Sequence, residues 1–121
     1  MDLFAKVLVA FVALIHVYIL YLEMFAWETR GRKAFKGALS DELFSATRVM
    51  AANQGLYNGF LASGLIWSLF ISDPVWSSNV ALFFLGCVTV AGIYGAMTIA
   101  RKIFFIQSLP ALLTILLILV L

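Results

Sequence analysis

The sequence predicts an all-α integral membrane protein, a single domain over residues 1–121 built as a bundle of four transmembrane helices. Apolar residues make up 64% of the 121 residues and charged residues only 12%, whereas soluble domains average roughly 45–50% and about 25%. The mean hydropathy is +1.09. The apolar residues also fall into four long runs separated by short polar segments. Helices are the expected form of these runs, because a helix satisfies its own backbone hydrogen bonds in lipid.

The same composition excludes several other classes of protein. The chain is too apolar for an ordinary soluble domain or a disordered chain, and eight Lys and Arg residues are too few for a nucleic-acid-binding surface. The single cysteine cannot form an internal disulfide, and the single histidine provides no set of metal ligands. We therefore expect no metal site. The sequence contains none of the motifs that indicate a catalytic centre. It has no nucleophile with a nearby base, no phosphate-binding glycine loop and no pair of carboxylates.

The first predicted helix covers about residues 3–27, in an apolar run that contains Lys6, His16 and Glu23. A helix needs roughly 20 apolar residues to cross the hydrocarbon core, so this run is long enough. A cleaved signal peptide is the alternative interpretation. It is disfavoured because Asp2 offsets the charge of Lys6 and because no A-x-A cleavage site follows.

The second and third helices are expected over residues 43–71 and 75–99. The first half of the second helix is semi-polar and its second half is apolar. The sequence Ser72-Asp73-Pro74 separates the two helices, because proline lacks the amide donor and restricts the residue before it.

The fourth helix is expected over residues 103–121, after a very short turn at Arg101 and Lys102. Its proline, Pro110, cannot donate a backbone hydrogen bond to the preceding turn. We therefore predict a kink close to Ile106.

The positions of the basic residues predict the orientation of the helices in a cell membrane. Cytoplasmic loops are enriched in Lys and Arg. The segments 28–42 and 100–102 carry most of these residues, whereas the turn between the second and third helices carries none. We therefore predict a multi-pass protein with both basic segments in the cytoplasm and both termini outside. Trp27 and Trp76 agree with this placement, since tryptophan favours the membrane interfaces.

Polar residues at membrane depth usually face a partner or a cavity, because exposure to lipid is costly. His16 and Glu23 are nearly two turns apart, so they lie on one face of the first helix, and Trp27 continues that stripe. These two residues form either a proton relay or head-group site, or an interhelical hydrogen bond that fixes packing.

The second helix carries a wedge of polar side chains. Asn53 and Tyr57 share one strip of this helix, and Gln54 and Asn58 share the neighbouring strip. The wedge either binds a ligand or forms a structural hydrogen-bond network. Arg48 either reaches lipid head groups or holds an anionic ligand through its planar fork. The candidate ligand-binding residues are His16, Glu23, Trp27, Arg48, Asn53, Gln54, Tyr57, Asn58, Tyr94 and Gln107.

Glycines on the second and third helices predict close helix packing. Gly55 and Gly59 form a G-x-x-x-G motif, and Gly92 and Gly95 lie on the third helix. Small residues let a second helix approach closely. We therefore expect packing seams at these positions, and a homo-oligomer in which they serve as contact surfaces.

Four segments of the chain are unusual as a set: Asn53-Gln54-Gly55-Leu56-Tyr57-Asn58-Gly59-Phe60-Leu61-Ala62, Leu22-Glu23-Met24 before Trp27, Ala91-Gly92-Ile93-Tyr94-Gly95 with Thr98, and Gln107 before Leu109-Pro110-Ala111. They resemble the small bacterial membrane proteins grouped as domain of unknown function 1304. The resemblance covers essentially the whole chain. It implies four helices and brings no established activity.

The layout is also similar, more distantly, to the MAPEG superfamily of membrane-associated proteins in eicosanoid and glutathione metabolism. Those proteins are four-helix homotrimers with a basic first cytosolic loop. Arg48 and Ala52 match their motif on the second helix, whereas Ala51, Gly55 and Asn58 replace its second arginine, asparagine and glutamate. The resemblance implies a trimer, and glutathione or another thiol as cosubstrate.

Three functions are compatible with these features. The favoured one is an uncharacterised membrane protein that binds a lipid or a small amphiphilic or anionic ligand in a polar pocket within the membrane. The second is a MAPEG-like transferase or isomerase that acts on a lipophilic substrate, with Arg48 holding a thiol cosubstrate. The third is a component of a proton-coupled transporter, in which His16 and Glu23 carry protons.

Overall fold

The computed structural model describes residues 1–121 and is all-helical, as predicted: its regular elements are helices, joined by turns, and one isolated bridge links Lys36 and Leu39. The long helices are α1 (Leu3–Phe25), α4 (Arg48–Phe70), α5 (Pro74–Thr98) and α6 (Leu109–Val120). The π-helical segment η2 (Phe104–Ser108) leads into α6. The connection from α1 to α4 is made by a second π-helical segment, η1 (Trp27–Gly31), followed by α2 (Arg32–Ala34) and α3 (Leu43–Ala46).

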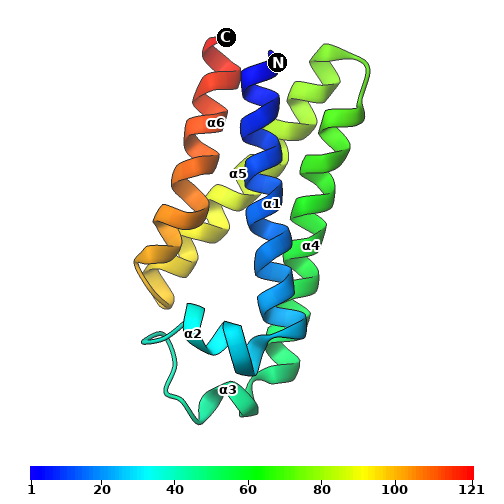
Figure 1. The fold of residues 1–121 in the computed structure, drawn as a ribbon. Coiled ribbons are helices and arrows are strands. Elements are labelled where there is room, and N and C mark those ends of the chain that lie inside the picture. Colours follow the sequence, from blue (N-terminus) through cyan, green and yellow to red (C-terminus); the bar gives the residue numbers. More distant parts are fainter.

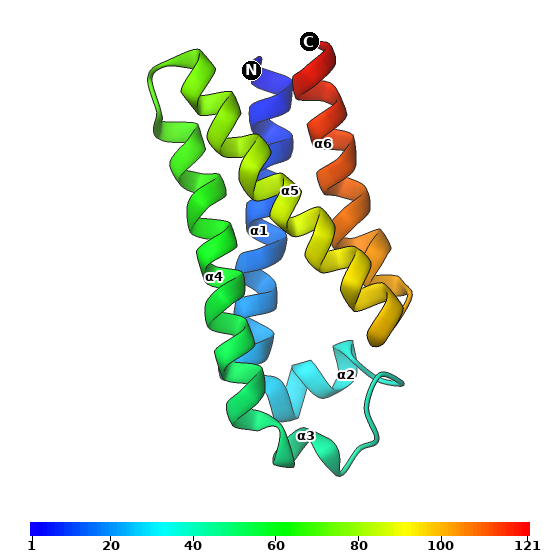
Figure 2. The same cartoon turned by 180° about the vertical axis from the view of Figure 1, so that it is seen from behind.

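The two termini and the α4–α5 turn lie at one end of the molecule, and α2 and α3 lie at the other (Figure 1). Helices α1 and α4 pack side by side along their length. Helix α5 crosses the bundle diagonally, so it separates from α4 toward the end that carries α2 and α3 (Figure 2). The cavities described below lie at this end.

The helix ends differ from the expected ones where side chains bond to the backbone. Helix α1 stops at Phe25 and continues as η1, although the sequence predicts one helix over residues 3–27. The helix expected over 43–71 is divided at Thr47, whose side-chain hydroxyl donates to the carbonyl oxygen of Leu43 at 2.8 Å. At the start of α5, Asp73 accepts hydrogen bonds from two backbone amides, and Pro74 follows in the first turn.

The core of the bundle is apolar and takes residues from all four long helices. Its members are Val9, Val12, Ala13, Leu65, Ala81, Leu85, Val88 and Ala111. Buried hydroxyl groups find partners on neighbouring backbone. Ser77 donates to the carbonyl oxygen of Ser68 at 2.8 Å, and Ser108 donates to that of Thr89 at 2.8 Å. Such pairing is the normal condition for a polar group in a protein interior.

The G-x-x-x-G motif of α4 packs against α1 of the same chain. A Cβ atom added at Gly55 would lie 2.7 Å from Cγ of Met24, and one added at Gly59 would lie 2.6 Å from Cδ1 of Leu20. Both distances are shorter than real Cβ contacts, so a methyl group at either position would force Met24 or Leu20 to move. The motif therefore contributes to the packing of α1 on α4 within one chain.

Two of the three glycines of α5, Gly92 and Gly95, face the segment that leads into α6. Gly92 lies against Ser108, and a Cβ atom at Gly95 would lie 3.0 Å from Ile103. The segment η2 can approach α5 because both positions lack a side chain. In η2 the amide of Leu109 donates to the carbonyl oxygen of Phe104. The π-helical turn thus stands immediately before Pro110, in the region where the sequence predicts a kink.

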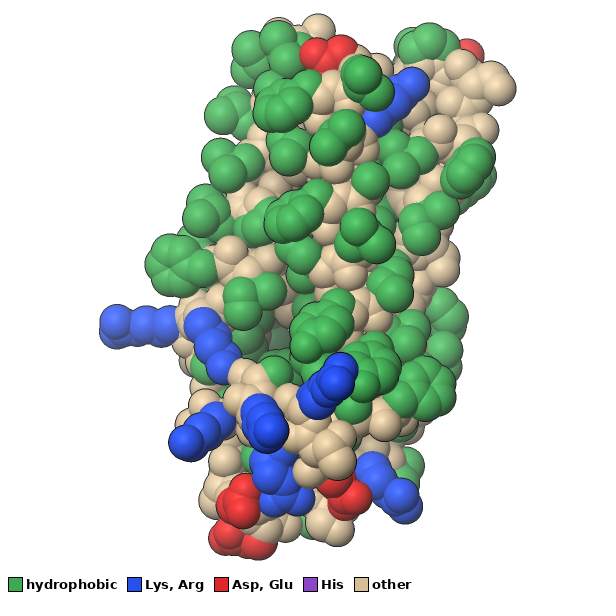
Figure 3. All heavy atoms as spheres, in the orientation of Figure 1, with side chains coloured by type: hydrophobic (Ala, Val, Ile, Leu, Met, Phe, Trp, Pro, Cys, Tyr) green, Lys and Arg blue, Asp and Glu red, His purple; other side chains and the backbone are tan.

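The helices α1 and α5 are long and apolar enough to cross a membrane, and residues 104–120 form a shorter apolar helix. Large apolar side chains cover much of the face seen in Figure 3. Lys and Arg side chains gather over the end that carries α2 and α3 (Figure 3). The composition of the surface is therefore compatible with a membrane protein.

The packing at Gly92 predicts opposite effects for two glycine substitutions on α5. We expect Gly92→Ala to lower the free energy of unfolding by about 1–3 kcal/mol, because its methyl group would clash with Ser108. We expect Gly86→Ala to be neutral or to stabilise by up to about 1 kcal/mol, because nothing lies within 4 Å of the added atom. Denaturation in detergent, followed by circular dichroism, measures both. Equal effects of the two substitutions would contradict the packing described here.

Candidate functional site

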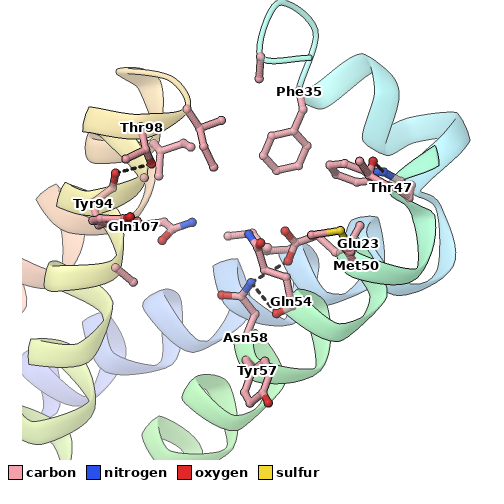
Figure 4. Close-up of a pocket in the computed structure, with 18 of the residues that line it drawn as sticks. Glu23, Phe35, Thr47, Met50, Gln54, Tyr57, Asn58, Tyr94, Thr98 and Gln107 are labelled. Atoms are coloured by element: carbon pink, nitrogen blue, oxygen red, sulfur yellow. Dashed lines mark hydrogen bonds between the residues drawn. The ribbon is translucent and has the colours of Figure 1, made fainter. Parts of the chain in front are cut away.

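A cavity of ≈ 560 Å³ lies between α1, α4, α5 and η2, near the end that carries α2 and α3 (Figure 4). This volume is typical of small-molecule sites, which span about 300–1,000 Å³. Of the 20 lining residues, 13 are hydrophobic. The side chains with polar groups that line it are those of Glu23, Trp27, Thr47, Gln54, Tyr57, Asn58, Tyr94, Thr98 and Gln107.

The polar centre of the cavity is a hydrogen bond between α1 and α4. The amide nitrogen Nδ2 of Asn58 donates to Oε1 of Glu23 at 2.7 Å and to the backbone oxygen of Gln54 at 3.2 Å. Only 2% of the surface of Glu23 is exposed. A Cβ atom at Gly55 would lie 3.0 Å from Cβ of Glu23. The glycine therefore lets α1 approach α4 closely enough for the carboxyl group to meet the amide.

An aromatic cluster closes the cavity at the end that carries α2 and α3. The ring centroid of Trp27 lies 5.3 Å from that of Phe35 and 5.0 Å from that of Phe44. The indole nitrogen Nε1 of Trp27 donates to Oγ1 of Thr47 at 3.0 Å. The connection between α1 and α4 is thus folded back beneath the bundle, where Trp27, Phe35 and Thr47 form part of the lining.

The opposite wall comes from α5 and η2. Tyr94 and Thr98 line it from α5, and the hydroxyl of Thr98 donates to the carbonyl oxygen of Tyr94 at 2.7 Å. Gln107 extends from η2 toward Gln54 (Figure 4). Tyr57 of α4 and Tyr94 of α5 also line the cavity and are 64% and 69% exposed, so its lining reaches the surface of these two helices. Both π-helical segments contribute to the cavity, and such segments are frequent at functional sites.

Three candidate residues lie outside the cavity. His16 is completely buried; its Nδ1 lies 2.9 Å from the carbonyl oxygen of Val12, to which it donates, and its Nε2 has no hydrogen-bond partner. Arg48 and Asn53 are exposed and contribute nothing to the lining. His16 and Glu23 therefore have different hydrogen-bond partners, although they share a helix.

Some lining residues were not among the candidates taken from the sequence. Phe35 and Thr47 belong to segments that reach the cavity only because the connection from α1 to α4 folds under the bundle. Their spacing in the sequence carries no signal of this. Thr98 had one signal, since it follows Tyr94 by one helical turn and therefore lies on the same face of α5.

The chemistry of the cavity is that of a hydrogen-bonding site in an apolar container. Its wall has one carboxyl group, amide groups and hydroxyl groups, and neither Lys nor Arg is among its 20 lining residues. Such a wall complements a ligand that combines an apolar body with a hydrogen-bonding group.

Comparison with known proteins identifies relatives along nearly the whole chain. A family described as "Protein of unknown function (DUF1304)" matches residues 10–119. The uncharacterized protein YpaA of Lactococcus lactis subsp. lactis (strain IL1403) is 30% identical over 116 residues, which cover 95% of this chain and 96% of that protein. No solved structure matches the chain significantly. These matches confirm the resemblance seen in the sequence motifs, and the chain therefore belongs to the DUF1304 family of proteins of unknown function.

Proposed function

We propose that the protein is a membrane protein that binds a lipid or small amphiphile in the cavity between α1, α4 and α5. The observation that supports this most directly is the hydrogen-bonded pair of Glu23 and Asn58 in a cavity with 13 hydrophobic lining residues of 20. An amphiphile satisfies both parts of such a site, because its apolar body covers the hydrophobic wall while its polar group pairs with the carboxyl and amide groups.

The polar group of this ligand is a hydrogen-bond donor, such as an amine or a hydroxyl. Carboxyl oxygens accept hydrogen bonds, and Glu23 presents the only carboxyl group of the lining. An anionic ligand group is disfavoured, because it would lie beside this carboxyl group and no Lys or Arg lines the cavity to neutralise it. Arg48 lies outside the cavity. For the same reason, no observation favours a carboxylated thiol such as glutathione as cosubstrate. None favours proton transport either, since His16 and Glu23 have separate partners.

In the proposed membrane arrangement, the four long helices span the bilayer and the cavity opens between α4 and α5 at the level of the inner leaflet. The segments 28–42 and 100–102 lie in the cytoplasm and both termini lie outside. The gathering of basic side chains at the α2 and α3 end supports this orientation (Figure 3). We include a homotrimer in this proposal only because the layout of the chain is similar to that of the MAPEG superfamily. The glycine motifs add no support, because they pack against segments of the same chain.

Cysteine labelling tests the orientation. In a Cys87→Ala background, we expect Ser72→Cys to react with a membrane-impermeant maleimide in intact cells. We expect Lys36→Cys to react only after the membrane is permeabilised, because it would lie on the cytoplasmic side. Both replaced residues are in loops, so neither substitution disturbs a long helix. Labelling of Lys36→Cys in intact cells would contradict the orientation.

The fluorescence of Trp27 tests the ligand site, because this residue lines the cavity. The substitutions Trp67→Phe and Trp76→Phe leave Trp27 as the only tryptophan. In nanodiscs of this variant, we expect octylamine and octanol to change the emission at lower concentrations than octanoate. We expect Asn58→Leu to weaken the response to octylamine about tenfold, because the ammonium group would lose the Oδ1 atom of Asn58 as an acceptor, and a hydrogen bond to a charged group is worth about 1.5–3 kcal/mol.

The matched control is Asn53→Leu, which removes the same kind of side chain from an exposed position on the same helix. We expect its titration to coincide with that of the parent. If octanoate bound as tightly as octylamine, or if both Asn→Leu substitutions had the same effect, the proposed site would be wrong.

A further inference from the structure

A second cavity, of ≈ 420 Å³, lies between α1 and the segment that leads into α6. It differs in character from the polar cavity, because 10 of its 12 lining residues are hydrophobic and the side chains with polar groups are only those of Tyr18, Lys102 and Gln107. The two cavities lie on opposite sides of a shared wall, formed by Ile19, Phe35, Ile103 and Gln107. Lys102 lines only the second cavity.

Lys102 is exposed and lines this apolar space beside Ala34 and Phe35. Its Nζ donates to the carbonyl oxygen of Ala34 and lies 6.0 Å from the centroid of the Phe35 ring. No carboxylate neutralises it, because the only ion pair of the chain joins Arg32 to Asp41. The second cavity therefore combines an apolar channel with one unneutralised positive charge.

The length of the channel matches one leaflet of a bilayer. Its lining on α1 extends from Phe11 to Leu22, which corresponds to a rise of roughly 16 Å along the helix. Half of the hydrocarbon core is about 15 Å. Lys102 stands at the end that carries α2, where the other basic side chains gather (Figure 3). A chain that filled the channel would thus end in the layer of lipid head groups.

From this geometry we propose that the second cavity binds an anionic phospholipid of the inner leaflet. One acyl chain lies along Phe11, Leu14 and Tyr18, and the phosphate group accepts hydrogen bonds from Lys102. The proposal rests on the membrane placement given above, and it is independent of the ligand in the polar cavity.

Native mass spectrometry of the full chain, with phosphatidylglycerol and phosphatidylcholine of the same acyl composition, tests the head group. We expect the parent protein to retain phosphatidylglycerol preferentially, and Lys102→Gln to lower this preference about fivefold, the effect of one cation near the head groups. The glutamine keeps a hydrogen-bond donor at this position and removes the charge. The matched control is Lys36→Gln, which removes the same charge from an exposed residue outside the cavity.

A second pair of substitutions tests the channel without changing the charge. Leu14→Trp places a larger side chain in the lining of the second cavity, whereas Leu113→Trp adds the same side chain on α6 at a position that lines neither cavity; both leucines are exposed, at 66% and 54%. We expect only Leu14→Trp to reduce the retention of phosphatidylglycerol. Circular dichroism establishes that each variant is folded, and Lys102→Arg, which keeps the charge, is expected to retain the preference.

The outcomes separate this site from the wider proposal. Equal effects of Lys102→Gln and Lys36→Gln would show that the attraction is spread over the basic surface, and would overturn the site. Equal effects of the two Leu→Trp substitutions would overturn it as well. If both lipids were retained without preference, the anionic site would be wrong while the membrane placement stood. Retention of neither lipid would overturn both.

Discussion

The close approach of α1 to α4 is the contact on which the rest of this structure depends. Because Gly55 and Gly59 have no side chains, Leu20 and Met24 of α1 can lie almost directly on the backbone of α4. This approach also brings Glu23 to Asn58, and so places a carboxyl group and an amide 2.7 Å apart in an apolar surrounding. A larger residue at Gly55 would separate the helices and the polar pair with them. Packing and the candidate site therefore have the same origin.

The diagonal course of α5 determines where the cavities form. Near the termini, α5 contributes Ala81, Leu85 and Val88 to the apolar core. Toward the other end α5 diverges from α4 (Figure 2). The polar cavity is lined by both helices at this end. The π-helical segment η2 is held against α5 at Gly92 and Gly95, which directs Gln107 into the gap. A bundle of parallel, evenly packed helices would have no such opening.

The two cavities differ in the chemistry that they offer, although they share a wall. One presents a carboxyl group with amides, and the other presents the ammonium group of Lys102 at the end of an apolar channel. The division between them includes Phe35, which reaches this place because the α1–α4 connection is anchored by Trp27 and Thr47. A loop that is polar in sequence thus supplies part of an apolar interior.

The sequence by itself determined that the protein is helical and that it belongs to the DUF1304 family. It also identified Glu23, Gln54, Asn58 and Gln107, polar residues in apolar segments, as candidates that line the cavity. Composition and periodicity carry the helical prediction because they are local, whereas the family is carried by the motifs of the sequence. Only the tertiary structure decided that Arg48, Asn53 and His16 lie outside the cavity while Phe35 and Thr47 line it. The orientation of a helix about its own axis, and the path of a loop, depend on contacts between segments distant in sequence, such as Gly55 with Glu23 and Trp27 with Thr47.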